Sequence, residues 1–256
     1  MGVVPVIHRS QAVRAALRRG LRPHRSRVAS CRTMVQVGRI LQKELVQAVV
    51  VDVRAGLLPS AKELMALYPR IPVFAYSAFR PDDGRLLAAC NAAGLRGILV
   101  DGIDESIAGE FVARRSAASE RKALLADAPR RLRLTEPVQI RAWEEVLDGV
   151  ETPLRTAEVA AALHVSREHL SREFAAGGAP NLKRVIDLAR IACAAHLMGN
   201  PGYTVTVVAG ILRFSSPGHL SSCARRVAGL SALGLAATGS RGVLERFLRG
   251  RTRSRL

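Results

Sequence analysis

The chain of 256 residues carries 39 Lys and Arg against 21 Asp and Glu, a formal net charge of +18, and 48% of its residues are hydrophobic. This hydrophobic content excludes a wholly disordered chain, and no run approaches the roughly 20 apolar residues that span a bilayer. We therefore expect a soluble cytoplasmic protein of one or two domains, with no export signal and no membrane partner.

The excess of positive charge indicates a polyanionic partner. Aromatic residues make up only 4% of the chain, too few for the stacking platforms of a single-strand binder, so a nucleic-acid partner is expected to be double-stranded. The four cysteines are Cys31, Cys90, Cys193 and Cys223. They form no Cys-x-x-Cys pair, which argues against a zinc site and against a disulfide framework. We expect no metal and no cofactor.

The first half of the sequence alternates apolar runs with amphipathic stretches. The apolar runs, mostly Val, Ile and Ala, are Val3–Ile7, Val28–Cys31, Ala48–Val53, Val73–Ser77 and Gly97–Val100. The stretches between them are long enough for helices, as at Gln11–Arg19, Met34–Glu44 and Ala61–Tyr68. This alternation is typical of a parallel sheet covered on both faces. Residues 1–115 are thus predicted to form a doubly wound α/β domain with five parallel strands.

Three segments of this half carry a family resemblance. They are residues 49–54 (VVVDVR), 72–78 (PVFAYSA) and 93–100 (AGLRGILV), and together they resemble the response-regulator receiver domain. In that family an Asp at the end of the third strand accepts a phosphoryl group, and a Ser or Thr at the end of the fourth strand senses it. The resemblance assigns these positions to Asp52 and Ser77.

Two departures from the receiver pattern affect the chemistry. The family holds magnesium with two acidic residues after the first strand and contacts the phosphate with a Lys after the fifth. Here His8 and Arg9 follow the first strand, and Asp101 follows the fifth. Because phosphoryl transfer depends on a divalent cation and a fixed positive charge, we expect a degenerate receiver-like domain in which Asp52 caps nearby amides. A phosphorylation-competent response regulator that uses Asp52 is the alternative.

The second half is predicted to be helical. Residues 116–135 are interpreted as a connector, because the Pro residues of Ala128-Pro129 and Glu136-Pro137 interrupt a helix. Residues 136–240 form the expected helical domain, and residues 241–256, with six Arg and one Glu, the expected basic tail.

A helix-turn-helix pattern follows the first amphipathic helix, Ile140–Leu147. Thr156 is expected to cap one helix and Ser166 the next, with His164-Val165 as the turn between them. The second of these helices places apolar side chains on one face at i, i+4 spacing, and polar ones on the other. The polar set, with its cap, offers groups that can meet base edges in a major groove: Ser166, Arg167, Glu168, Ser171 and Arg172.

The same region resembles the AraC-type DNA-binding domain, in which one long helix joins two helix-turn-helix units. The resemblance lies in residues 159–174, 190–198 and 204–216, and Ser216-Pro217 begins the second recognition helix. It implies further residues directed to DNA in the second unit: Ser216, Gly218, His219, Ser222 and Arg225.

The second unit departs from the family more than the first. Arg213 stands where the turn Gly is usual, so a residue with a Cβ is expected to take positive φ at a cost of about 1 kcal/mol. Ala224 replaces a core Phe, and Ser222 replaces a common Arg. We expect this helix to form but to read bases weakly.

These observations predict a sequence-specific transcriptional regulator that binds double-stranded DNA, with a receiver-like domain that does not depend on phosphorylation. A homodimer is compatible with this prediction. No nucleotide-binding loop, nucleophile elbow or zinc-protease motif occurs, which argues against an enzyme. A protein-interaction module that has lost specific DNA binding is the remaining alternative.

Overall fold

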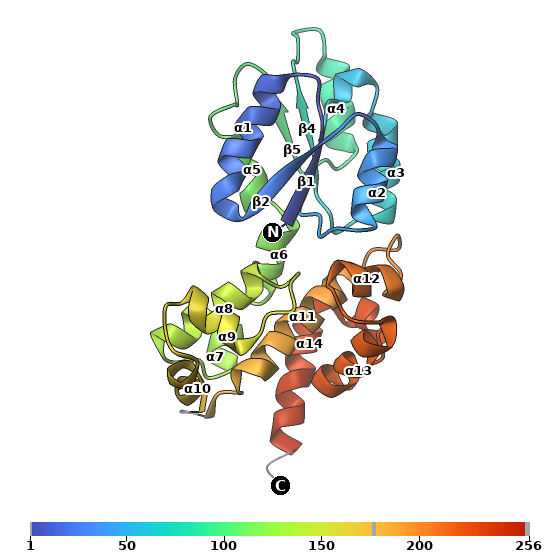
Figure 1. Cartoon of the computed structure of the whole chain (residues 1–256). Helices are drawn as coiled ribbons and strands as arrows, with labels where there is room; N and C mark the ends of the chain where they lie inside the picture. Colours follow the sequence, from blue (N-terminus) through green and yellow to red (C-terminus); the bar gives the residue numbers. More distant parts are fainter. Residues whose placement is uncertain (1, 176–177, 254–256) are drawn as a thin grey trace. The chain divides into compact units, whose positions relative to one another are not determined.

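The computed structural model describes residues 2–175 and 178–253, with side chains as far as residue 250 (Figure 1). The chain divides into two compact units, residues 1–120 and 121–256. In the described part of the chain, none of the helices combines the length and the apolar character needed to cross a membrane.

The first unit is a five-stranded parallel sheet with helices on both faces. The strands are β1 (Gly2–Ile7), β2 (Ser26–Cys31), β3 (Val49–Val51), β4 (Val73–Ser77) and β5 (Gly97–Val100). They lie in the order β2-β1-β3-β4-β5, which is the doubly wound flavodoxin-like order of receiver domains. The predicted fold of this half is therefore confirmed.

The helices of the first unit follow the strands in alternation. They are α1 (Gln11–Leu21), η1 (Arg22–His24), α2 (Met34–Leu41), η2 (Val53–Ala55), α3 (Leu58–Leu67), α4 (Gly84–Ala92) and α5 (Ala108–Arg114). Helices α1 and α5 cover one face of the sheet, and α2, α3 and α4 cover the other (Figure 1). A Cβ added to Gly20 of α1 would lie 2.7 Å from the Cα of Gly109 in α5, so two glycines permit this close helix contact.

The core of the first unit comes from the continuous apolar strands. Every residue of β1, β3 and β4 is buried. In the register of the sheet, Ile7 lies beside Val51 and Val51 beside Ala75. This alignment brings the loops after β1, β3 and β4 to one edge, where the residues of the receiver resemblance meet.

The second unit is helical. Its helices are α6 (Ala117–Leu124, which begins before the division), α7 (Ala128–Arg131), α8 (Pro137–Asp148), α9 (Thr156–Ala162), α10 (Arg167–Ala175), α11 (Leu182–Met198), α12 (Val205–Ile211), α13 (Pro217–Ala228) and α14 (Gly234–Arg253). Helix α11 is buried along most of its length and contacts α8, α12, α13 and α14. The predicted α/β domain followed by a helical domain is confirmed.

The expected connector and the expected basic tail both contain helices. The stretch expected as a connector forms α6 and α7, and Leu125 and Leu132 beside them are buried. The stretch expected as a basic tail is instead helical as far as Arg253, after a break in α14 at Gly239 (φ 65°, ψ 176°), and this corrects that expectation; residues 254–256 of the expected tail lie outside the described residues. The reason is an apolar side of α14 that includes Leu244 and Phe247, both buried, while Arg241, Arg246 and Arg249 are exposed.

Candidate nucleic-acid interface

The first helix-turn-helix unit consists of α9, a left-handed turn at His164 and α10. His164 has φ of 56°. Two backbone hydrogen bonds close the end of α9, from His164 N–H to the Ala161 carbonyl at 3.1 Å and from Val165 N–H to the Ala160 carbonyl at 3.0 Å. This is the usual pairing at a helix end with a left-handed residue. The turn ends α9 directly before α10 begins.

The start of each helix in this unit is capped by a side chain. Ser166 Oγ accepts a hydrogen bond from His169 N–H at 3.0 Å, as predicted for the start of α10. The expected cap at Thr156 is wrong, because Thr156 is the first residue of α9 and Arg155 is its N-cap residue. The Glu158 carboxylate accepts from Arg155 N–H at 2.7 Å instead, which satisfies that amide and places a negative charge at the helix N-terminus.

Helix α10 separates a buried face from an exposed one. Leu170 and Phe174 are each 1% exposed. Gln139 of α8, also buried, donates from Nε2 to the carbonyl of Glu173 at 2.7 Å and so fixes the C-terminal turn of α10. The predicted DNA-facing residues of this unit are all exposed together: Ser166, Arg167, Glu168, Ser171 and Arg172.

The second helix-turn-helix unit repeats this geometry with α12, Arg213 and α13. Arg213 has φ of 52°, as expected where the turn lacks Gly. Its N–H bonds the Gly210 carbonyl at 3.0 Å, and Phe214 N–H bonds the Ala209 carbonyl at 2.8 Å. Ser216 Oγ caps α13 by accepting from His219 N–H at 3.0 Å. Both units therefore use the same turn and the same serine cap.

Helix α13 forms without the usual core Phe. Ala224 is fully buried, and Leu220, Cys223 and Val227 complete the buried face. The predicted DNA-facing residues of this unit are exposed on the other side: Ser216, Gly218, His219, Ser222 and Arg225. His219 is partly engaged within the protein, since its Nδ1 lies 2.9 Å from Ser215 Oγ and its ring packs edge-on against Phe214.

A buried arginine anchors the second turn. Arg190 of α11 is 8% exposed and donates from Nη2 to the carbonyl of Leu212 at 2.7 Å. Its guanidinium lies 4.1 Å from the centre of the Phe214 ring. Desolvation by burial lowers the pKa of Arg190, but an arginine stays charged across the physiological range. This side chain ties the turn before α13 to the central helix.

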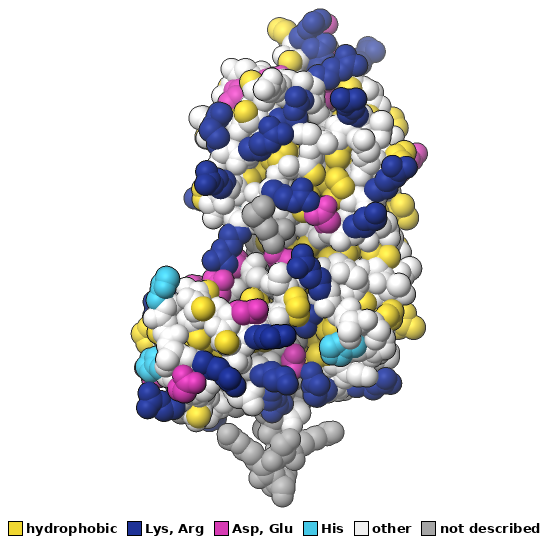
Figure 2. Space-filling view, viewed as in Figure 1, with side chains coloured by type: hydrophobic (Ala, Val, Ile, Leu, Met, Phe, Trp, Pro, Cys, Tyr) yellow, Lys and Arg dark blue, Asp and Glu magenta, His cyan; other side chains and the backbone are white. Residues whose placement is uncertain are grey.

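Helix α14 brings further arginines next to α13, and sequence analysis had not assigned them to the interface. A cavity of about 430 Å³ is lined by Arg225 and Arg226 from α13 and by Arg246 and Arg249 from α14. Arg226 also pairs with Asp187 at 2.8 Å. The spacing of Leu244, Phe247 and Leu248 was the signal for this helix. Lys and Arg side chains recur over the visible face of this unit in Figure 2.

The receiver-like edge of the first unit centres on Asp52, directly after β3. Asp52 Oδ1 accepts hydrogen bonds from Ser77 Oγ at 2.7 Å and from Arg54 N–H at 3.2 Å. Ser77 Oγ itself accepts from Val53 N–H at 3.0 Å. Asp52 therefore caps η2, as predicted, and is held by the serine with which the resemblance paired it.

The positions where a receiver holds magnesium carry no carboxylate here. His8 is 7% exposed, its Nδ1 accepts from Ser10 N–H at 3.0 Å, and its Nε2 lies 3.8 Å from Asp101 Oδ2. Burial raises the pKa of Asp101, although His8 opposes that shift. Within residues 2–175 and 178–253, no group of three or more His, Cys, Asp or Glu side chains could hold a metal ion.

Comparisons with known proteins bear on the helical unit, residues 121–256. Residues 159–235 match a family model described as a helix-turn-helix domain, which is of the AraC type. The chain is also similar to a solved structure of full-length FixJ from B. japonicum, with 17% identity and a TM-score of 0.36 over 90% of this chain and 98% of that chain. No curated protein matches the chain.

Proposed function

The helical unit, residues 121–256, contains a helix-turn-helix domain of the AraC type. On that premise we propose that the protein is a sequence-specific transcriptional regulator of double-stranded DNA. The observation that carries this proposal is the repeated geometry. Two serine-capped helices, α10 and α13, each follow a left-handed turn and expose a polar face. Such a helix presents side chains to base edges in a major groove.

The proposed contacts to DNA come from α10, α13 and α14. We assign base contacts in the first unit to Arg167, Glu168, Ser171 and Arg172, with Ser166 at the helix start, and weaker contacts in the second to Ser216, Gly218, His219 and Ser222. Arg225, together with Arg246 and Arg249, offers positive charge to phosphates. Phosphate contacts supply affinity for any duplex, and base contacts supply preference.

The proposal is tested by selecting bound duplexes from a random pool with the full chain. We expect one recurrent site, bound about 10³-fold or more tightly than unrelated duplex at the same salt concentration. The slope of log affinity against log salt measures the phosphate contacts. Equal binding to all duplexes after selection would contradict sequence-specific recognition and favour the interaction-module alternative.

We further propose that the receiver-like unit acts without phosphorylation. Asp52 is engaged as a cap, and His8 and Arg9 stand where the metal-binding acids of a receiver would be. A divalent cation would thus lack the oxygen ligands it prefers.

Incubation with a small phosphodonor and magnesium should add no mass, and Asp52→Asn should leave DNA affinity unchanged. Asp52→Glu serves as the charge-retaining control. A mass gain that disappears in Asp52→Asn would overturn this part of the proposal and place the protein among phosphorylation-competent regulators, without affecting the DNA assignment.

A further inference from the structure

A basic cavity lies at the carboxyl ends of β1, β2 and β3, outside the surface assigned to DNA. Its volume is about 870 Å³. Four arginines line it, Arg9, Arg14, Arg18 and Arg32, and Asp52 is the one acidic residue among the lining side chains. In doubly wound sheets, ligands bind outside the carboxyl ends of the strands where the strand order reverses, which here is between β1 and β3.

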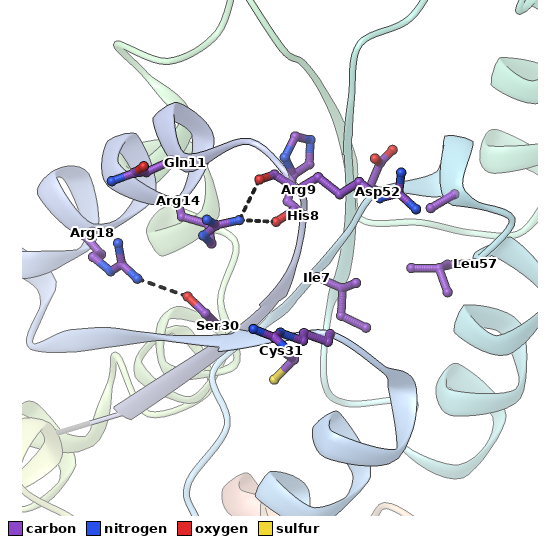
Figure 3. Close-up of a pocket in the computed structure, with 12 residues that line it drawn as sticks. Ile7, His8, Arg9, Gln11, Arg14, Arg18, Ser30, Cys31, Asp52 and Leu57 are labelled. Atoms are coloured by element: carbon purple, nitrogen blue, oxygen red, sulfur yellow. Dashed lines mark hydrogen bonds between the residues drawn. The ribbon is translucent and has the colours of Figure 1, made fainter.

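Two of the arginines are held in place by the protein. Arg14 donates from Nη1 to the carbonyl of Arg9 at 2.9 Å and also to the carbonyl of His8, and Arg18 donates from Nη2 to Ser30 Oγ at 3.0 Å. Figure 3 shows Arg14 and Arg18 on the α1 side of the cavity, with Asp52 and Leu57 opposite. Each guanidinium has five N–H donors, so both retain donors for a ligand.

The charge of the cavity is not neutralised within the protein. Among the described residues, no carboxylate lies within 4.0 Å of the guanidinium nitrogens of these four arginines. Arg9 and Arg32 are exposed. Converging like charges repel one another, and an anion bound between them would relieve that repulsion. A magnesium ion, in contrast, would be repelled.

The size and lining of the cavity narrow the class of anion. Small-molecule sites occupy roughly 300–1,000 Å³, so this cavity exceeds what a single inorganic ion fills. Ile7, Ala55 and Leu57 add apolar surface beside the arginines. The planar fork of Arg binds phosphate oxygens in pairs. We propose that this cavity binds an organic phosphate of nucleotide size, as an effector site that goes beyond the proposed DNA function.

The test measures binding to the full chain, without DNA, by titration calorimetry. The probes are pyrophosphate and ADP, with adenosine and succinate as the uncharged and carboxylate comparisons. The variant is Arg9→Gln with Arg32→Gln, because neither side chain donates a hydrogen bond within the described part of the protein. The control is Arg19→Gln with Arg39→Gln, an equal loss of charge from exposed positions of α1 and α2 outside the cavity.

We expect ADP to bind, the Arg9 and Arg32 double variant to weaken it at least tenfold, and the control to change it less than twofold. Four results would overturn the proposal: no binding of ADP tighter than about 1 mM, equal loss in both double variants, binding of succinate or adenosine as tight as that of ADP, or displacement of ADP by random duplex at equal phosphate concentration. None of these results depends on whether the helical unit recognises a DNA sequence.

Discussion

The two helix-turn-helix units share their backbone geometry and differ in the side chains that surround it. The turns at His164 and Arg213 have φ of 56° and 52°, and the serine caps accept hydrogen bonds of equal length, 3.0 Å. The first recognition helix exposes two arginines beside Glu168 and Ser171, whereas the corresponding part of the second exposes Gly218, His219 and Ser222. The two units thus share their local geometry and differ in the side chains that they expose beside it.

The units also differ in how they are anchored. Gln139 of α8 holds the C-terminal end of α10, whereas Arg190 of α11 holds the turn that precedes α13. Helix α14 then lies against α13 and supplies further arginines. We propose on this basis that the first helix-turn-helix unit reads sequence and that the second, more basic around its helix end, supplies general affinity. Each prediction below tests one part of this division.

The largest effect is expected for Arg190→Ala, which removes the anchor of the second turn. The Leu212 carbonyl would lose its partner and Phe214 its packing against the guanidinium, at a cost of about 3 kcal/mol in the free energy of unfolding. Denaturant unfolding measures this change. Lys183→Ala, on an exposed position of the same helix, should stay within about 0.5 kcal/mol of the parent.

Amide hydrogen exchange in the Arg190→Ala variant compares the stability of the two helix-turn-helix units. Protection in Arg190→Ala should fall first in α12 and α13, while α9 and α10 retain theirs. Equal loss in both units would show that they share a single anchor and would break the comparison.

Base discrimination should depend on Arg172 more than on Arg225. Arg172→Ala should cost about 2 kcal/mol on the selected site and little on random duplex, since a bidentate contact to a base is lost. Arg225→Ala should weaken both duplexes alike and reduce the salt slope by about one. Binding assays on the two duplexes at several salt concentrations measure these differences. Equal losses on both duplexes for Arg172→Ala would remove the first helix from base reading.

The two halves of the selected site should be unequal. Scrambling the half under the first unit should abolish preference, whereas scrambling the other should cost at most about tenfold, or roughly 1.4 kcal/mol. Footprinting of the parent protein first identifies which half lies under which unit. A dominant second half would reverse the assignment of roles.

The smallest effect is expected at the turns, where the two units agree. His164→Gly and Arg213→Gly should each stabilise the protein by about 0.5 kcal/mol, because Gly adopts positive φ without the Cβ penalty. Both side chains are exposed, so little packing is lost. Ala161→Gly, inside α9, should instead destabilise by about 1 kcal/mol. Opposite signs at the two turns, measured by denaturant unfolding, would show that their surroundings differ.

Sequence alone could predict features that depend on neighbouring residues. The serine caps, the strands and the positive φ at Arg213 follow from local hydrogen bonding and side-chain sterics, which act over three or four residues. The cap at Thr156 was assigned one residue too late. The N-cap residue is Arg155, whose backbone N–H donates to the Glu158 carboxylate. Because no Ser, Thr, Asp or Asn stands at the N-cap position, the sequence pattern does not identify the first residue of this helix.

Other features depended on residues distant in the chain. The arginines of α14 had been assigned to a tail, because a sequence count of charge does not show that Phe247 packs beneath Arg184, 63 positions earlier, where the guanidinium lies 5.0 Å from the ring centre. The hydrogen bond from Arg190 to Leu212 likewise joins residues on different elements. The sequence indicated a helix-turn-helix pattern but did not indicate the side-chain contacts that hold its turn in place.

The sequence by itself determined the alternation of strands and helices, the two turns and their caps, because each depends on short-range periodicity and local hydrogen bonds. Tertiary structure alone decided that Arg9, Arg14, Arg18 and Arg32 converge on one cavity and that α14 completes the basic surface beside α13. The parallel register aligns the ends of β1, β2 and β3, and burial of Leu244 and Phe247 fixes which side of α14 faces outward. Convergence of like charges is opposed by repulsion, which is offset by the packing energy of the surrounding core and by the hydrogen bonds that hold Arg14 and Arg18.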